Sequence, residues 1–305
     1  MNTSNVARAV RSDDFHPIAG FGPELDGGLM HTFEMPVGIG NLTATASPEL
    51  RTAPRLSLFL PGFSGSKEDF LSFFPQLYAK LDDPAERALA SFSLRGQADS
   101  VAPAGQGAYR LEDFVADGCR VMEQLATSEY PIDLVGHSFG GVVARRMTIA
   151  RPDLVRSLTL FSTGAVPIGQ SEITRSAKAL IEQYGTMVVF KGNFPDCSDE
   201  PQDDPYTEMC RLRAHATSID NLLAMSDILI HYNDVTNALK DTGVPVSIVY
   251  GANDLVWPQP VYVAEAKALG VTPTVIADAG HSGQLDNPEV LATALVNFWD
   301  HCGES

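Results

Sequence analysis

Short apolar runs alternate with amphipathic segments over most of this chain. The apolar runs predict strands at residues 56–60, 88–94, 132–135, 158–162, 246–250 and 274–277. Apolar residues at helical spacing predict helices at residues 67–80, 111–128, 139–150, 259–269 and 287–300. Continuously hydrophobic strands separated by helices are typical of a parallel sheet that is covered on both faces. The pattern therefore predicts an α/β fold with a doubly wound, mostly parallel sheet.

Two parts of the chain depart from this alternation. Residues 29–46 alternate weakly and predict an N-terminal hairpin that turns at residues 36–38. Residues 163–243 show helical patterns and no convincing strand, and their acidic, proline-containing run at 193–209 fits either a solvated loop or a lid edge that disfavours anionic substrates. We divide the chain into an N-terminal arm (1–28), a first core segment (29–162), a helical insertion (163–243) and a second core segment (244–305).

Composition and charge narrow the possible partners. The 305 residues are 44% hydrophobic and 19% charged, as in an ordinary globular protein, and their net charge is −17. This negative charge repels phosphates, so we expect no binding to nucleic acid or anionic lipid. We find neither an apolar run long enough to span a membrane nor a secretory signal at the N-terminus. We expect a cytoplasmic protein with a small-molecule substrate; the sequence leaves a monomer and a homodimer equally open.

The cysteines predict no metal site. None of the four has C-x-x-C spacing, and no histidine cluster accompanies them, which argues against structural zinc. Cys197 and Cys210 could pair, but a cytosolic compartment would keep them reduced, so we expect free thiols. Nothing in the sequence calls for a metal or an organic cofactor.

Candidate chemistry begins with a G-x-S-x-G segment at residues 136–140. Ser138 follows a predicted strand and precedes a predicted helix, which is the context of a nucleophile elbow, a sharp turn that exposes the serine hydroxyl above the sheet. Gly136 and Gly140 leave room where a β-carbon would collide. We interpret Ser138 as a nucleophile and its neighbour His137 as a structural residue that points elsewhere.

A serine nucleophile needs a base and an acid that orients the base. Of the seven histidines, His281 has the required place, in a glycine-flanked loop after the last predicted strand. Asp254 directly follows the preceding predicted strand, and the chain order Ser138, Asp254, His281 is the order of this architecture. Asp278 is the alternative acid. Acyl transfer also needs donors for an oxyanion, and we expect these to be the backbone N–H groups of Phe63 and Phe139.

Together these motifs resemble the α/β-hydrolase superfamily in its capped serine hydrolase branch. The resemblance covers about residues 50–162 and 244–302 and rests on LPGFSGSKEDF, SLRGQADS, GHSFGG, YGANDLVWP and AGHSGQLDNPE. Pro61 stands where the family usually has a histidine before the glycine, and Ser93 and Ala98 depart from its D-x-R-G-x-G-x-S segment. The dehalogenase and epoxide-hydrolase relatives use an aspartate nucleophile instead of the serine found here.

The resemblance implies that residues 163–243 form a helical cap that closes the pocket and selects the substrate. Candidate substrate-binding residues are Phe63, Phe139, Val166, Met187, Met225, Ile228 and Trp257, any of which could instead belong to the core. The expected reaction is hydrolysis of a small, mainly apolar carboxylic ester, lactone or thioester through an acyl-enzyme on Ser138. Carbon–carbon bond hydrolysis, a lyase or perhydrolysis reaction on the same triad, and a ligand receptor remain alternatives.

Overall fold

The described part of the chain is built on one twisted sheet. The computed structural model describes residues 16–17, 25, 27–169 and 172–302. Within these ranges nine strands pair in the order β1-β2-β3-β5-β4-β6-β7-β8-β9. Their bounds are β1 His16–Pro17, β2 His31–Val37, β3 Gly40–Ala46, β4 Arg55–Leu60, β5 Arg87–Phe92, β6 Ile132–His137, β7 Val155–Phe161, β8 Val246–Gly251 and β9 Thr274–Ile276.

The sheet has a parallel centre and an antiparallel edge. Strands β5, β4, β6, β7, β8 and β9 run parallel to one another. Strands β1, β2 and β3 form antiparallel pairs, and β3 also pairs antiparallel with β5. Every residue of β5 and β6 is buried. Burial on both faces explains why these strands read as unbroken apolar runs in the sequence.

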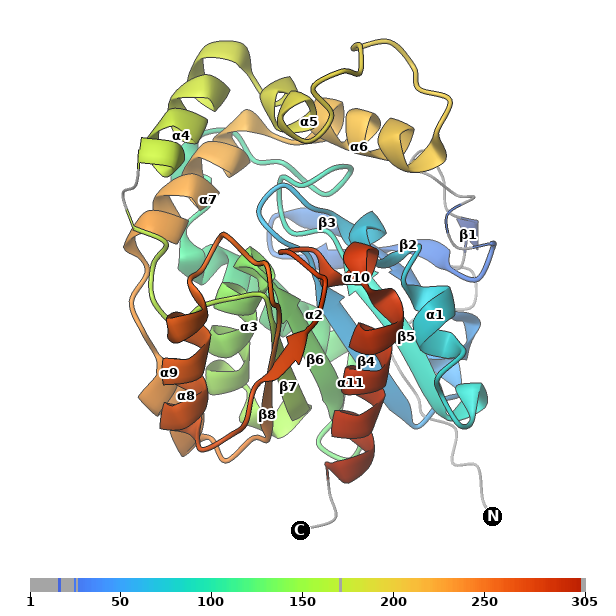
Figure 1. The fold of residues 1–305 in the computed structure, drawn as a ribbon. Coiled ribbons are helices and arrows are strands. Elements are labelled where there is room, and N and C mark those ends of the chain that lie inside the picture. Colours follow the sequence, from blue (N-terminus) through green and yellow to red (C-terminus); the bar gives the residue numbers. More distant parts are fainter. Residues whose placement is uncertain (1–15, 18–24, 26, 170–171, 303–305) are drawn as a thin grey trace.

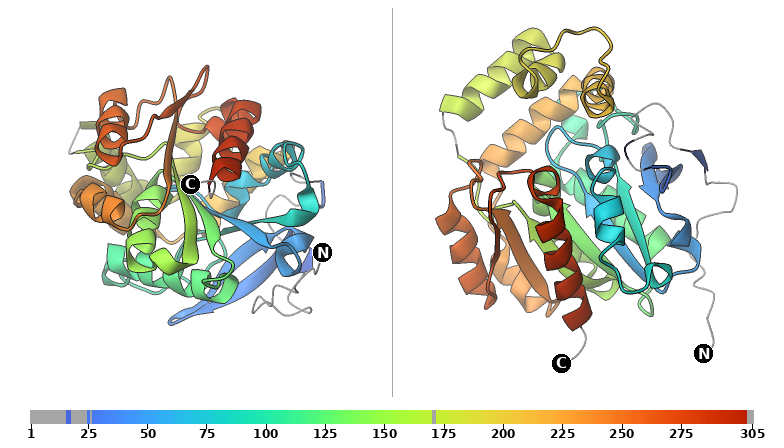
Figure 2. Two further views of the ribbon diagram at one scale, coloured as in Figure 1. Left: turned by 90° about the horizontal axis from the view of Figure 1, so that it is seen from below. Right: turned by 45° about the vertical axis from the view of Figure 1, so that its right-hand side comes forward.

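Helices cover both faces of the sheet (Figures 1 and 2). On one face, α2, α3, α8 and α9 enclose the larger apolar core; on the other, α1 and α11 pack together over the second. The helix bounds are α1 Phe74–Tyr78, α2 Leu111–Leu125, α3 Phe139–Ala150, α4 Glu172–Tyr184, α5 Met187–Asn193, α6 Pro205–Ala216, α7 Ile219–His231, α8 Thr236–Asp241, α9 Gln259–Leu269, α10 Gly283–Asp286 and α11 Pro288–His301.

Helices α4 to α7 form a separate layer over one end of the sheet (Figure 1). They lie in the chain between β7 and β8, together with α8, which packs against α9. Two small apolar clusters hold the layer together, one around Phe190 and Met209 and one around Ile181 and Leu222. We call α4 to α7 the cap helices. The α/β class, the mostly parallel sheet and the helical insertion predicted from the sequence are confirmed.

The predicted elements differ from the observed ones in two places. The single helix predicted at 67–80 is divided into a short 3-10 helix, η4 (Lys67–Phe70), and α1. Pro75 accounts for the break, because proline lacks the N–H for a mid-helix hydrogen bond but fits the first turn of a new helix. The hairpin turns at residues 38–39, since Val37 already pairs with Gly40. The predicted N-terminal arm lies mostly outside the described residues.

The structure also bears on the cysteine and membrane expectations. Cys119, Cys197, Cys210 and Cys302 all have free thiols, so Cys197 and Cys210 are not paired. Among the described helices, none combines the length and the apolar character needed to cross a bilayer.

A buried ion pair fastens the helix that follows the central strand. The side chains of Arg145 of α3 and Glu265 of α9 are each at most 1% exposed, and the guanidinium reaches both carboxylate oxygens, at 2.8 and 2.7 Å. The same guanidinium donates to the backbone oxygen of Thr163 at 2.9 Å. The pair therefore joins α3, α9 and the chain that leaves β7.

Removing one member of this pair should be costly. Glu265→Leu leaves a buried guanidinium without its counter-ion, so we expect the free energy of unfolding in urea to fall by about 3–5 kcal/mol. The paired variant Arg145→Met/Glu265→Leu should recover most of that loss, because two apolar side chains need no partner. Equal losses in the single and paired variants would contradict this account.

Candidate active site

Ser138 lies on a sharp turn between β6 and α3. Its backbone has φ 53° and ψ −119°, a conformation that side-chain-bearing residues rarely adopt and that is often found at functional sites. The turn is possible because two glycines allow close backbone approach. A β-carbon on Gly136 would lie 2.6 Å from the Cα of Gly141, and one on Gly140 would lie 2.5 Å from the Leu60 oxygen. The geometry is that of a nucleophile elbow.

His281 and Asp254 meet beside this turn. His281 lies between β9 and α10, Asp254 lies after β8, and the imidazole Nδ1 is 3.1 and 3.0 Å from the two carboxylate oxygens. This contact fixes the proton on Nδ1 and leaves Nε2 free as an acceptor. Asp278, the alternative acid, is exposed and has a left-handed backbone with φ 58°. The structure therefore brings Asp254, rather than Asp278, to the histidine.

The Asp254 carboxylate is buried but well supplied with donors. The Tyr262 hydroxyl donates to Oδ2 at 2.7 Å, and the Val256 N–H donates to Oδ1 at 2.8 Å. Burial alone would raise the pKa of Asp254, but the hydrogen bonds from His281, Tyr262 and Val256 outweigh it and hold the pKa below its ordinary value. The aspartate is thus kept ionised. Tyr262, which lies on α9 eight residues after Asp254, was not predicted from the sequence.

Ser138 and His281 line the same cavity. Ser138 is 5% exposed, and the His281 side chain is 25% exposed. The hydrogen bonds of these two described residues do not include one between the serine hydroxyl and the imidazole. Such bonds are often long in unliganded sites and shorten when substrate binds. The structure thus places an elbow serine and an aspartate-bound imidazole on one cavity wall.

His137, which we interpreted from the sequence as a structural residue that points elsewhere, contacts the His281 loop. Its Nε2 donates to the backbone oxygen of His281 at 2.9 Å, and the two rings lie 5.0 Å apart between centroids. Burial, together with the neighbouring His281, lowers the pKa of His137 to about 3, so the ring stays neutral at ordinary pH. His137 thereby positions the His281 loop. Its place next to Ser138 in the chain gave no sign of this cross-loop contact.

The loop after β4 approaches the serine closely. A β-carbon on Gly62 would lie 3.2 Å from Cβ of Ser138 and 3.3 Å from Nδ1 of His137. Within the described part of the chain, the N–H groups of Phe63 and Phe139 have no intramolecular hydrogen-bond partner. Phe139 is also the first residue of α3, where the helix dipole favours negative charge. Both expected oxyanion donors are therefore free to bond an acceptor.

Gln97 supports this loop and was not singled out from the sequence. The side chain is fully buried, donates to the Gly62 oxygen at 2.7 Å and accepts from the Leu94 N–H at 2.9 Å. Gln97 belongs to the SLRGQADS segment that carried part of the family resemblance. A buried amide with both ends bonded holds the loop in one position.

Trp257 connects the loop of Asp254 to the cap. Its Nε1–H donates to the Val166 oxygen at 2.9 Å, and a β-carbon on Gly164 would come within 2.4 Å of the indole ring. Tyr232, just after α7, donates its hydroxyl to the Gly164 oxygen at 2.8 Å. The chain that enters the cap and the chain that leaves it therefore meet at Trp257.

The cavity has a volume of about 530 Å³, within the range of small-molecule sites. The lining as a whole is mainly apolar, with polar side chains contributed by both the core and the cap. The lining includes Phe63, Ile168, Leu229, Ile230, Val256, Trp257, Asp69, Asn193, Tyr206, Cys210, Arg213 and Gln284. Across the described ranges, no three His, Cys, Asp or Glu side chains are arranged to hold a metal ion.

Of the expected substrate-binding residues, Phe63 and Trp257 line this cavity. The other five lie elsewhere. Phe139 packs edge-on against Phe114 at 5.3 Å between ring centroids, and Met225 and Ile228 belong to the core or pack against it. Val166 borders a separate groove beside α8 and α9, and Met187 packs into the Phe190 cluster. The resemblance implied a cap over the cavity but did not reveal which residues would face it.

An elbow at the end of a central parallel strand, beneath an inserted layer of helices, defines the α/β-hydrolase architecture. The chain belongs to the alpha/beta hydrolase family, whose model matches residues 58–294.

Comparison with known proteins gives relatives of varied activity. The biotin biosynthesis bifunctional protein BioHC of Teredinibacter turnerae is 24% identical over 270 residues, which are 79% of this chain and 44% of that protein. The chain thus spans less than half of this relative. A carboxylesterase structure from Nitrososphaera gargenis has a TM-score of 0.70 at 17% identity, covering 87% of this chain and 97% of the other. A thermophilic esterase from Thermogutta terrifontis has a TM-score of 0.66 at 18% identity, with coverages of 88% and 98%. These structural likenesses show a shared fold.

The neutral state of His137 predicts an acid-sensitive component of stability. Its pKa is about 3 in the folded protein against 6.5 for the ordinary group, so between these values only the unfolded chain binds the proton. The contribution is complete above pH 6.5 and is lost as the pH falls toward 3. Between about pH 7 and pH 5 the wild type should lose about 2 kcal/mol more unfolding free energy than His137→Phe, as measured in urea.

The matched control is His301→Gln, which removes an exposed histidine at the C-terminal end of α11. It should keep the wild-type difference between the two pH values. An unchanged pH slope in His137→Phe would contradict the burial of a neutral ring at this position.

Proposed function

We propose that this protein is a serine hydrolase that cleaves a small, mainly apolar carboxylic ester, lactone or thioester through an acyl-enzyme on Ser138. One observation carries the proposal: the elbow serine and the Asp254-bound imidazole of His281 line the same cavity. This shared cavity supports a nucleophile, a base and an orienting acid that act together in acyl transfer.

In the proposed first step, Ser138 Oγ attacks the substrate carbonyl carbon. His281 Nε2 takes the hydroxyl proton, because Nδ1 already donates to Asp254. Asp254 stays ionised and stabilises the imidazolium that forms. The imidazolium then gives its proton to the departing oxygen or sulfur as its bond to the carbonyl carbon breaks, so that an alcohol or thiol is released and the acyl-enzyme forms.

The negative charge that develops on the carbonyl oxygen needs donors at the elbow. The free N–H groups of Phe63 and Phe139 would supply them, with Gln97 holding the Gly62 turn in place. In the second step His281 takes a proton from water, the resulting hydroxide attacks the acyl carbon, and the acid product leaves as Ser138 regains its proton.

The cavity and the charge of the chain support a neutral substrate. The cavity lining is mainly apolar, and a net charge of −17 disfavours anions approaching the protein. Two proteins of the same fold are described as a carboxylesterase and an esterase, which agrees with ester-type chemistry. A small-molecule substrate fits the cavity volume of about 530 Å³.

A fluorophosphonate probe tests the nucleophile directly. The wild-type protein should be labelled at Ser138, and Ser138→Ala should lose both labelling and ester hydrolysis. His281→Ala should lose nearly as much activity as Ser138→Ala, because members of a triad act as a unit. Labelling and rates on a panel of ester, lactone and thioester substrates give the measurement.

The same panel separates the proposal from its alternatives. A burst of alcohol from a chromogenic ester indicates an acyl-enzyme. No labelling of folded protein would count against a serine hydrolase. Turnover of a vinylogous diketone without any ester burst would instead favour carbon–carbon hydrolysis, and tight ligand binding without turnover would favour a receptor.

Asp254 and the alternative acid Asp278 give a matched pair of variants. Asp254→Asn should lower kcat by at least about 100-fold, since it removes the charge that stabilises the imidazolium, while leaving the fold intact. Asp278→Asn, at an exposed position away from the imidazole, should stay within about twofold of wild type. Steady-state kinetics on one ester checks both variants. If Asp278→Asn were the damaging change, the acid assignment would be wrong.

A further inference from the structure

An ion pair lies in the wall of the cavity that contains Ser138. Asp69 of η4, on the sheet side, and Arg213 of α6, on the cap side, both line the cavity that contains Ser138. Arg213 Nη1 donates to Asp69 Oδ1, and the two side chains are only 10% and 12% exposed. The proposed reaction uses neither residue.

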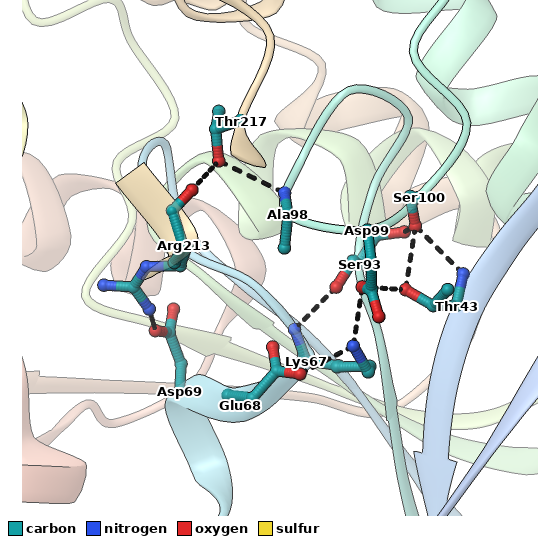
Figure 3. A network of polar contacts seen from close by, with 10 residues as sticks. All are labelled: Thr43, Lys67, Glu68, Asp69, Ser93, Ala98, Asp99, Ser100, Arg213 and Thr217. Carbon is teal, nitrogen blue, oxygen red and sulfur yellow. Dashed lines mark hydrogen bonds and ion pairs between the residues drawn. The ribbon is translucent and has the colours of Figure 1, made fainter. Parts of the chain in front are cut away.

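The Asp69 side of the pair is held rigidly. Its neighbour Lys67 is buried and pairs with Glu68 at 2.6 Å and Asp99 at 2.7 Å, while the Lys67 N–H donates to the Ser93 hydroxyl (Figure 3). Gly65 leaves space for the carboxylate, since a β-carbon there would lie 2.0 Å from Asp69 Oδ2. The acceptor is thus fixed to the core.

The Arg213 side is held by the end of α6. The Thr217 hydroxyl donates to the Arg213 backbone oxygen at 2.8 Å and accepts from the Ala98 N–H at 3.1 Å (Figure 3). Arg213 Nη2 also contacts the Cys210 sulfur at 3.5 Å. Core and cap therefore meet at a preorganised pair, and a bound group would not need to order either side chain.

Both members of the pair retain hydrogen-bonding capacity. A guanidinium has five N–H donors, and the side-chain bonds of Arg213 use its Nη1 and Nη2 groups, one partner each. Among the described residues, nothing donates to Asp69 Oδ2. The wall consequently offers a donor beside an acceptor within a cavity that is otherwise mainly apolar.

We propose that this pair is a specificity site for a neutral group that both donates and accepts hydrogen bonds. The substrate class is an ester-type compound whose acyl or alcohol part ends in a hydroxyl or a primary carboxamide. Such a group accepts from Arg213 and donates to Asp69 without changing the charge of the wall. This inference rests on the proposed serine hydrolase function and narrows its substrate class.

We call the group at the end of the acyl or alcohol part the tail of the substrate. A charged tail fits the wall formed by Asp69 and Arg213 less well than a neutral polar one. A carboxylate would meet Asp69 as well as Arg213, so two negative charges would share one guanidinium in a poorly hydrated place. An ammonium group would face Arg213 in the same way. The pair therefore selects against both signs of charge, and an alkyl tail would leave its polar atoms unpaired.

Esters that differ only at the tail test this inference. Matched series of increasing acyl length should end in hydroxyl, carboxamide, methyl, carboxylate or ammonium groups. At the best length, kcat/KM for the hydroxyl or carboxamide tail should exceed that for the methyl tail by about 100-fold, because a site built to bond a polar group rejects the analogue that lacks it. Both charged tails should fall below the neutral polar tails by about tenfold or more.

The paired variant Asp69→Leu/Arg213→Met replaces the ion pair with apolar side chains and should abolish the preference for a hydroxyl over a methyl tail. Its folding is checked by circular dichroism and thermal unfolding. The matched control is Glu208→Leu/Arg211→Met, which removes an ion pair on the same helix that does not line the cavity. This control should keep the wild-type preference.

Three kinetic results would overturn the inference: equal rates for methyl and hydroxyl tails, a wild-type preference for the carboxylate tail, or an unchanged preference in a folded Asp69→Leu/Arg213→Met variant. If that variant does not fold, the wild-type tail series decides. Binding of the hydroxyl- and methyl-tailed esters to Ser138→Ala, measured by calorimetry, separates this inference from the proposed function. Failure to hydrolyse even a short acetate ester would contradict the proposed hydrolase function. Equal binding of the hydroxyl- and methyl-tailed esters would contradict the specificity site alone.

Discussion

The close approach of β6, α3 and the loop after β4 is the constraint on which the site depends. Gly140 touches the backbone where β4 ends, and Gly62 touches Ser138 and His137 from the other side. Because main chain meets main chain here, the positions of the serine hydroxyl and of the neighbouring N–H groups are coupled. The left-handed turn at Ser138 persists because the surrounding sheet and helix leave it no alternative. Precision at the nucleophile is thus a property of the backbone more than of side-chain packing.

Buried polar groups extend this precision outward. His137 ties the His281 loop to the elbow, Gln97 ties the Gly62 turn to the neighbouring loop, and Tyr262 holds Asp254. Each of these groups is buried and hydrogen-bonded. The hydrogen bonds offset the cost of removing the group from water and fix its position. The ion pair between Asp69 and Arg213 is a further buried polar contact in the cavity lining, between core and cap.

The sequence predicted the core better than the cap, for a physical reason. Strands and helices of the core bury continuous or periodic apolar faces, and the candidates Ser138, Asp254 and His281 follow strands, so their convergence at one sheet edge could be foreseen. Met187 and Met225 were candidates for the cavity because the resemblance implied a cap over it, but a resemblance does not reveal which face of a cap helix meets the cavity. His137 and Tyr262 were missed because their partners are distant in the chain or reached through a loop. The break at Pro75 was a local signal that a longer periodic pattern obscured.

The meeting of Gly164, Tyr232 and Trp257 gives the cap a narrow base. The cap helices form one long insertion, and the two ends of this insertion meet next to the loop that carries Asp254. The entropy of closing such an insertion grows only with the logarithm of its length. Helices can therefore be added, lost or exchanged beyond this base at little cost in chain entropy, while the elbow and the acid loop keep their place. Trp257 thus lies at the junction between core and cap, and the length of the insertion beyond this junction has little effect on the entropy of closing it.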